Sequence, residues 1–246
     1  MKSRMFMTRS NNVLILVHGA MGSHRAWHYQ VEKLSTKIKV IAVDLPGDSK
    51  AEAPKAPKMD TYVTFLDELL NEIKPNKVIL GGQSMGGAVI LSYSFQYPDK
   101  VDGLILVGTG ARLRVLPAIL ELSQSNYPEL IRMVGKAAFH KRTYENNKPL
   151  IAEVAKNMAL ISPQVAYHNW KICNEFDVME RLGEIQIPTL IICGDEDKLT
   201  PIKYSKYLNE HIKNSSLYVI EGAGHMVMLE QPDAVNEAIE KFLERF

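Results

Sequence analysis

A serine between two glycines is the part of this chain best suited to chemistry. Gly82 and Gly86 stand two residues before and two residues after Ser84. Glycines at these positions let the backbone turn tightly and expose the serine hydroxyl, in the turn called a nucleophile elbow. The turn needs a strand before it and a helix after it, and the apolar residues of 78–80 and 88–95 fit both requirements. We therefore predict that Ser84 is a catalytic nucleophile.

A serine hydroxyl is a weak nucleophile at neutral pH, so it needs a histidine to take its proton and a carboxylate to hold that histidine. His225 follows an apolar run at 217–220 on a glycine-rich loop, and we predict that it is the general base. Asp195, Glu196 and Asp197 follow the preceding apolar run. Their spacing alone does not decide which of the three acids completes the site.

The residues with possible chemistry lie at the ends of short apolar runs, which are candidate strands. The runs are 13–17, 40–43, 78–80, 104–107, 190–193 and 217–220. They are nearly continuous rather than alternating, and helical patterns lie between many of them, as in a parallel sheet covered on both faces. The fold class is therefore α/β, with a doubly wound and mostly parallel sheet. The apolar stripe in 231–246 predicts a terminal helix that packs on this sheet.

Between residues 110 and 187 the sequence shows helical patterns and no strand-like run. Ser162 followed by Pro163 is typical of a helix start there. We interpret residues 112–187 as a helical cap inserted into a core formed by residues 1–111 and 188–246.

Four motifs together resemble the α/β-hydrolase superfamily, over almost the whole chain. They are His18-Gly19, the Ser84 elbow, Gly194-x-x-Asp197 and Gly224-His225, in the chain order Ser, Asp, His. The resemblance implies that Asp197 is the catalytic acid. It also implies that the backbone amides of Ala20 and Met85 form the oxyanion hole, and that His18 orients the loop that carries Ala20.

The chain departs from the family pattern at two places. Only about a dozen residues precede the first candidate strand, so one or two edge strands are expected to be missing. The turn at residues 44–49 resembles a family motif shortened by two residues. The short N-terminus leaves the predicted catalytic core unaffected.

We predict a serine hydrolase, foremost a carboxylesterase that cleaves small to medium acyl esters through a Ser-His-Asp triad and an acyl-enzyme. The same motifs also occur in lactonases, thioesterases, perhydrolases, carbon-carbon bond hydrolases and the lyase of menaquinone biosynthesis, and they do not separate these activities. A receptor that binds a small molecule without turnover is a further alternative.

Several residues near the motifs are candidates for substrate contact. They are Met21, Trp27, Leu199 and Met226, with Arg112 and Arg114 as candidate ligands of a substrate carboxylate at the entrance of the cap. The aliphatic and aromatic side chains favour an uncharged acyl group, whereas the arginines favour an acidic substrate.

The composition excludes other classes of function. The net charge is +1 and the chain has no dense Lys/Arg run, so its charge does not indicate binding to nucleic acid or to a membrane surface. No histidine pair has metal-ligand spacing and no glycine-rich loop is followed by lysine, so we expect neither a metal nor an organic cofactor. The first ten residues lack the apolar core of a signal peptide, so we expect a cytoplasmic protein. The sequence does not settle the oligomeric state.

Overall fold

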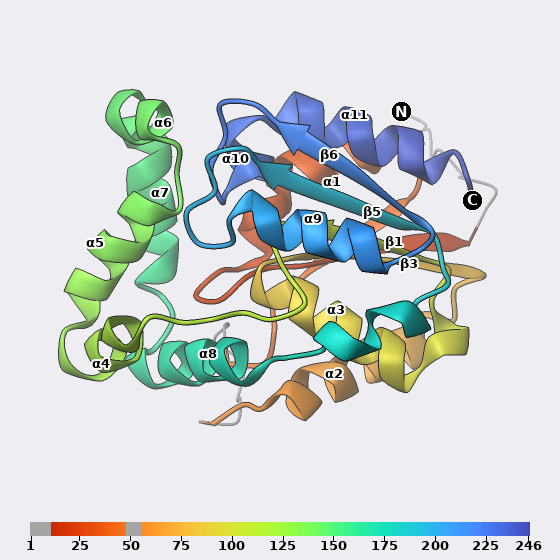
Figure 1. The fold of residues 1–246 in the computed structure, drawn as a ribbon, viewed down its shortest axis with the longest axis horizontal. Helices are drawn as coiled ribbons and strands as arrows, with labels where there is room; N and C mark the ends of the chain where they lie inside the picture. Colours follow the sequence, from red (N-terminus) through yellow and green to blue (C-terminus); the bar gives the residue numbers. More distant parts are fainter. Residues whose placement is uncertain (1–10, 48–55) are drawn as a thin grey trace, which may run out of the picture.

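The structure is a computed structural model that describes residues 11–47 and 56–246. At its centre is a six-stranded sheet in the order β2-β1-β3-β4-β5-β6, in which all neighbouring strands are parallel (Figure 1). The strands are β1 (Asn12–Val17), β2 (Lys39–Val43), β3 (Lys77–Gln83), β4 (Gly103–Val107), β5 (Thr189–Gly194) and β6 (Ser215–Ile220). Each predicted apolar run lies inside one of these strands, so the predicted α/β class is confirmed.

Burial follows the position of each strand in the sheet. Every residue of β4 and β5 is buried, because helices cover both faces of the central strands. The edge strand β6 is only partly buried, and Tyr218 and Val219 are exposed on it. β3 runs three residues beyond its apolar part because Gly81, Gly82 and Gln83 still pair with β4.

Five helices pack on the sheet. They are α1 (His28–Leu34), α2 (Met59–Ile73), α3 (Met85–Gln96), α9 (Ile202–His211) and α11 (Pro232–Leu243). α1 and α11 contact each other on one face, and α2, α3 and α9 lie on the other (Figure 1). Nine of the twelve residues of α3 are buried, as expected of a helix enclosed by its neighbours. The terminal helix α11 buries the predicted stripe of Val235, Ile239 and Phe242.

The strand order reverses between β1 and β3, and this reversal fixes where the site lies. In open parallel sheets, ligands bind in the crevice at the carboxyl ends of the strands, at such a reversal. The loops that follow β1, β3, β5 and β6 all leave the sheet at this edge, and they carry every residue for which we predict a catalytic role.

The segment between β4 and β5 is helical. It contains α4 (Pro117–Ser125), α5 (Tyr127–Ala137), α6 (Lys141–Asn146), α7 (Lys148–Met158), α8 (Pro163–Glu175) and the short 3-10 helix η3 (Met179–Glu184). α5, α6 and α7 stand beyond the carboxyl ends of the strands (Figure 1). Ser162 caps α8 by accepting a hydrogen bond from the amide of Val165. The division of the chain into core and cap at residues 112 and 187 stays a prediction.

Two sequence expectations fall partly outside the described residues. The expected lack of N-terminal edge strands concerns residues 1–10, and the shortened turn includes residues 48 and 49. Within the described ranges, no helix combines the length and the apolar character needed to cross a membrane.

Candidate active site

Ser84 occupies a sharp turn between β3 and α3. Its φ of 54° and ψ of −117° are uncommon for a residue with a side chain. The turn is held on both sides of the peptide, since the Ser84 amide donates to the carbonyl of Val107 at 3.0 Å and the Thr109 hydroxyl donates to the Ser84 carbonyl at 2.8 Å. A side chain at Gly82 would overlap the backbone of Gly86. The predicted elbow is therefore present.

The structure distinguishes the three acids that the spacing left open. Asp197 Oδ2 lies 2.8 Å from Nδ1 of His225. Asp195 instead accepts hydrogen bonds from the backbone of the histidine loop, and Glu196 contacts His140 of the cap segment. Only Asp197 among the three meets the imidazole of His225.

Asp197 is buried, and donors surround its carboxylate. The amides of Leu199 and Thr200 each donate to Oδ1 at 2.8 Å, and the Thr200 hydroxyl donates to Oδ2 at 2.7 Å. Burial by itself raises the pKa of Asp197, but the charge and hydrogen bond of His225 and the hydrogen bonds from Thr200 together bring this pKa below its usual value. An ionised Asp197 keeps the proton of His225 on Nδ1, which leaves Nε2 as the proton acceptor.

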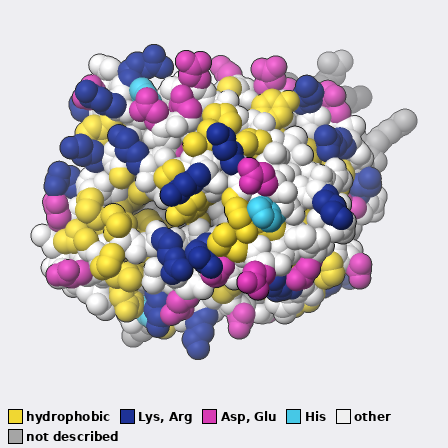
Figure 2. Space-filling model, viewed as in Figure 1, with side chains coloured by type: hydrophobic (Ala, Val, Ile, Leu, Met, Phe, Trp, Pro, Cys, Tyr) yellow, Lys and Arg dark blue, Asp and Glu magenta, His cyan; other side chains and the backbone are white. Residues whose placement is uncertain are grey.

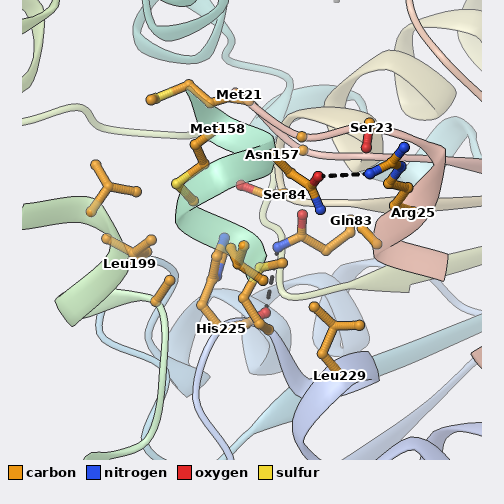
Figure 3. Close-up of a pocket in the computed structure, with 18 of the residues that line it drawn as sticks. Met21, Ser23, Arg25, Gln83, Ser84, Asn157, Met158, Leu199, His225 and Leu229 are labelled. Carbon is orange, nitrogen blue, oxygen red and sulfur yellow. Dashed lines mark hydrogen bonds between the residues drawn. The ribbon is translucent and has the colours of Figure 1, made fainter. Parts of the chain in front are cut away.

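Ser84 and His225 line one pocket beneath the cap segment, which we call the first pocket (Figure 3). Its wall on the cap side is aliphatic. The residues there are Val134, Ala138, Leu150, Val154 and Met158. Arg25 and Glu153 also line this pocket, and Arg25 donates to Asn157 at 3.2 Å.

The predicted oxyanion loop follows β1 as a tight turn. The Gly22 amide donates to the carbonyl of Gly19 at 3.0 Å, and Met21 has a φ of 60°. The amide of Ala20 lies inside this turn and the amide of Met85 begins α3. Among the described residues, no acceptor is recorded for either amide. Both are therefore suited to bind a developing oxyanion.

His18 orients this loop, as the resemblance implies. It is fully buried; its Nδ1 lies 2.8 Å from the Gly19 carbonyl, and its Nε2 accepts from the Leu45 amide at 3.1 Å. Accepting at Nε2 places the ring proton on Nδ1. Burial lowers the pKa of His18, more than its hydrogen bond to Gly19 raises it. A neutral His18 therefore ties the loop after β1 to the loop after β2.

Sequence reasoning missed three residues that hold the loops carrying the predicted catalytic residues. Gln83 donates to the His225 carbonyl at 3.4 Å (Figure 3). Glu230 accepts from the amides of Gly224 at 2.8 Å and His140 at 2.9 Å. The indole of Trp170 on α8 donates to the sulfur of Met21 at 3.2 Å. The sequence carries no signal for these contacts, because each joins residues that only the fold brings together.

The candidates for substrate contact divide in the structure. Met21, Leu199 and Met226 line the first pocket. Trp27 does not line it and is fully buried in the core, so packing is its role in the structure. The Arg112 guanidinium is paired with Asp177. Arg114 lines a second pocket that also reaches Ser84.

Within residues 11–47 and 56–246, no group of three or more His, Cys, Asp or Glu side chains is arranged to hold a metal ion. The proposed chemistry uses side chains and backbone amides only.

Comparisons with known proteins agree with this architecture. A model of the Alpha/beta hydrolase family matches residues 14–238. A solved structure described as a thermophilic esterase is 34% identical, with a TM-score of 0.81 over 94% of this chain and 89% of the other. An esterase from Exiguobacterium antarcticum has a TM-score of 0.89 over 96% and 92% of the two chains, and at 24% identity this likeness shows the fold alone. Among curated proteins, 3-oxoadipate enol-lactonase 2 of Acinetobacter baylyi is 27% identical over 89% of this chain and 84% of its own.

Proposed function

The chain belongs to the alpha/beta hydrolase family, and from that premise we propose that it is a serine carboxylesterase for small to medium acyl esters. The observation that carries the proposal is the contact between His225 and the buried Asp197, in a pocket that Ser84 also lines. The esterase relatives support it. Ser84, His225 and Asp197 are the proposed triad, and the amides of Ala20 and Met85 are the proposed oxyanion hole.

The reaction begins at the serine hydroxyl. Ser84 Oγ attacks the ester carbonyl carbon while His225 Nε2 takes the hydroxyl proton, and Asp197 stabilises the imidazolium that forms. The carbonyl oxygen becomes an oxyanion bound by the amides of Ala20 and Met85. One such donor contributes about 3 kcal/mol in comparable enzymes.

The second half releases the acid. The tetrahedral intermediate collapses, the bond to the alcohol oxygen breaks, and His225 gives its proton to the departing alcohol. Water then loses a proton to His225 and attacks the acyl-enzyme carbonyl. A second collapse returns the proton to Ser84 and frees the carboxylic acid.

A lactonase is the second candidate, because a curated relative is an enol-lactonase. The steps are the same, except that the alcohol and the acid leave as one hydroxy acid. Comparing open-chain esters with lactones of equal carbon number distinguishes the two activities.

The test is hydrolysis of nitrophenyl esters from acetate to dodecanoate. We expect turnover by the native protein and by the control Ser125→Ala, because Ser125 is exposed at the end of α4 and its hydroxyl donates to the backbone carbonyl of Glu121. Ser84→Ala is expected to be inactive. A phosphonate probe that labels Ser84 is the independent readout. A folded native protein that neither turns over any ester or lactone nor takes up the probe would contradict the proposal and favour a receptor.

A further inference from the structure

The second pocket meets the first at Ser84. It lies between residues 113–116, α8 and the beginning of α9, and Leu113, Ile119 and Trp170 are among its apolar lining. A substrate whose carbonyl sits at Ser84 therefore reaches into both pockets. His225 lines only the first of them.

Three cationic side chains line the second pocket. They are Arg114, Lys198 and Lys203, and no aspartate or glutamate of the described residues lines it with them. The face drawn in Figure 2 carries Lys and Arg side chains near its middle, with hydrophobic and acidic side chains beside them.

None of these three cations is committed to a carboxylate. Within the part of the chain that the structure describes, no ion pair within 4.0 Å involves any of them. Cations nearby do have such partners, since Arg112 is paired with Asp177 and Lys171 with Glu175. Asp177 does lie within electrostatic range of Arg114, and Lys203 Nζ lies 5.9 Å from the ring centroid of Tyr204. Neither contact is an ion pair, so the positive charge around the second pocket can still act on a ligand.

The start of α9 adds to the positive electrostatic potential in the second pocket. α9 has ten residues and no acidic side chain in its first turn, where a carboxylate would normally complement the helix dipole. Pro201 precedes the helix and lines the second pocket. The positive end of the dipole therefore faces the same space as the three side chains.

General basicity does not explain the cluster, because the whole chain has a net charge of only +1. Like charges around one concave surface repel each other, and an anion placed among them removes that repulsion. The first pocket differs, because Glu153 lines it together with Arg25, and Arg25 donates a hydrogen bond to Asn157.

We propose that the second pocket is a subsite for an anionic group of the substrate, and that Arg114, Lys198 and Lys203 bind this group. The protein then prefers esters or lactones that carry a carboxylate or similar anion. This inference rests on the proposed function, because it places the anion relative to a carbonyl at Ser84.

Two matched pairs of esters test the proposal and show which side of the ester carries the charge. 4-Nitrophenyl hydrogen glutarate against 4-nitrophenyl pentanoate places the anion on the acyl side. 4-Acetoxybenzoate against 4-acetoxybenzamide places it on the alcohol side. For one of the two pairs we expect a higher kcat/KM for the anionic ester than for the neutral one. The ratio of these two kcat/KM values is expected to fall as salt is added.

The double variant Arg114→Gln/Lys203→Gln is expected to lower that ratio by about tenfold, since two partly exposed ion pairs are lost. Lys136→Gln is the matched control, because Lys136 is an exposed lysine on α5 that lines neither pocket. The proposal would be overturned if the native protein had the higher kcat/KM for the neutral ester in both pairs. It would also be overturned if the double variant and Lys136→Gln had the same ratio of kcat/KM values.

Binding of glutarate, measured by calorimetry, separates this inference from the proposed function. If no ester is hydrolysed, the carboxylesterase proposal fails, yet glutarate is still expected to bind the native protein and to bind the double variant about tenfold more weakly. Absence of glutarate binding to the native protein, or equal binding to the native protein and the double variant, contradicts the subsite itself.

Discussion

Replacing Asp197 by asparagine probes the proposed triad through the tautomer of His225. The four groups that contact the Asp197 carboxylate all act as donors. The backbone amides of Leu199 and Thr200 point at Oδ1, and the Thr200 hydroxyl and the His225 ring point at Oδ2. An asparagine has only one oxygen, so it satisfies only one of these two sets.

The structure indicates which set keeps the oxygen. Two backbone amides with fixed directions face Oδ1, so the asparagine NH₂ cannot lie there. The NH₂ group then faces Nδ1 of His225, which must accept a hydrogen bond and carry its proton on Nε2. Such an imidazole cannot take the proton of Ser84. We expect kcat to fall by about 10³ to 10⁴, or about 4 to 5.5 kcal/mol in the activation barrier.

The assay is steady-state hydrolysis of a nitrophenyl ester, with the tautomer read from the ¹⁵N shifts of His225. Asp195→Asn is the matched control, since one oxygen, Oδ1, accepts from both Gly222 at 2.9 Å and Ala223 at 3.3 Å and asparagine retains it. We expect that control to stay within about threefold of the native kcat, because its hydrogen bonds survive. Equal losses in the two variants, or native kcat in Asp197→Asn, would refute the reasoning.

Two further predictions concern the elbow and the histidine loop. A side chain at Gly86 would overlap the backbone carbonyls of Val17 and His18 at the end of β1, so Gly86→Ala is expected to lower the free energy of unfolding by about 3 kcal/mol. Gly135 in α5 has nothing within 4 Å of an added methyl group, so Gly135→Ala is expected to raise the free energy of unfolding by about 0.5 to 1 kcal/mol. Denaturant titrations measure both changes. Glu230→Ala leaves two backbone amides without their acceptor, so it is expected to lower the free energy of unfolding by about 2 kcal/mol. It is also expected to lower kcat more than it changes KM. The control Glu221→Ala is expected to show neither effect. Burial raises the pKa of Glu230 above its ordinary value of 4.5, although its hydrogen bonds lower it. The contribution of Glu230 to stability is therefore full below pH 4.5 and declines as the pH rises through the raised pKa. A Glu230→Ala variant whose unfolding has the native pH dependence would contradict this assignment.

Local requirements of the chain could be predicted from the sequence, and long-range partnerships could not. The Ser84 elbow depends on glycines two residues before and after the serine, so five consecutive residues of the sequence are enough to predict it. Asp197 and its neighbours are equivalent by spacing; the family resemblance favours Asp197, and in the structure only Asp197 of the three contacts the His225 ring. Arg112 was a candidate ligand for a substrate carboxylate, but Asp177, 65 residues away, already pairs with it. The partners of Glu230 depend in the same way on how the cap segment packs.

The segment between β4 and β5 does more than cover the pocket, because it contacts the loops that carry the proposed catalytic residues. The Met226 amide, next to His225, donates to the carbonyl of Ala138 at the end of α5. Trp170 of α8 holds Met21 in the turn that carries the proposed oxyanion amide of Ala20. A misplacement of about 1 Å in such groups costs on the order of a hundredfold in rate. Changes to the apolar wall of the first pocket are therefore expected to alter kcat together with substrate preference, unless these two contacts are preserved.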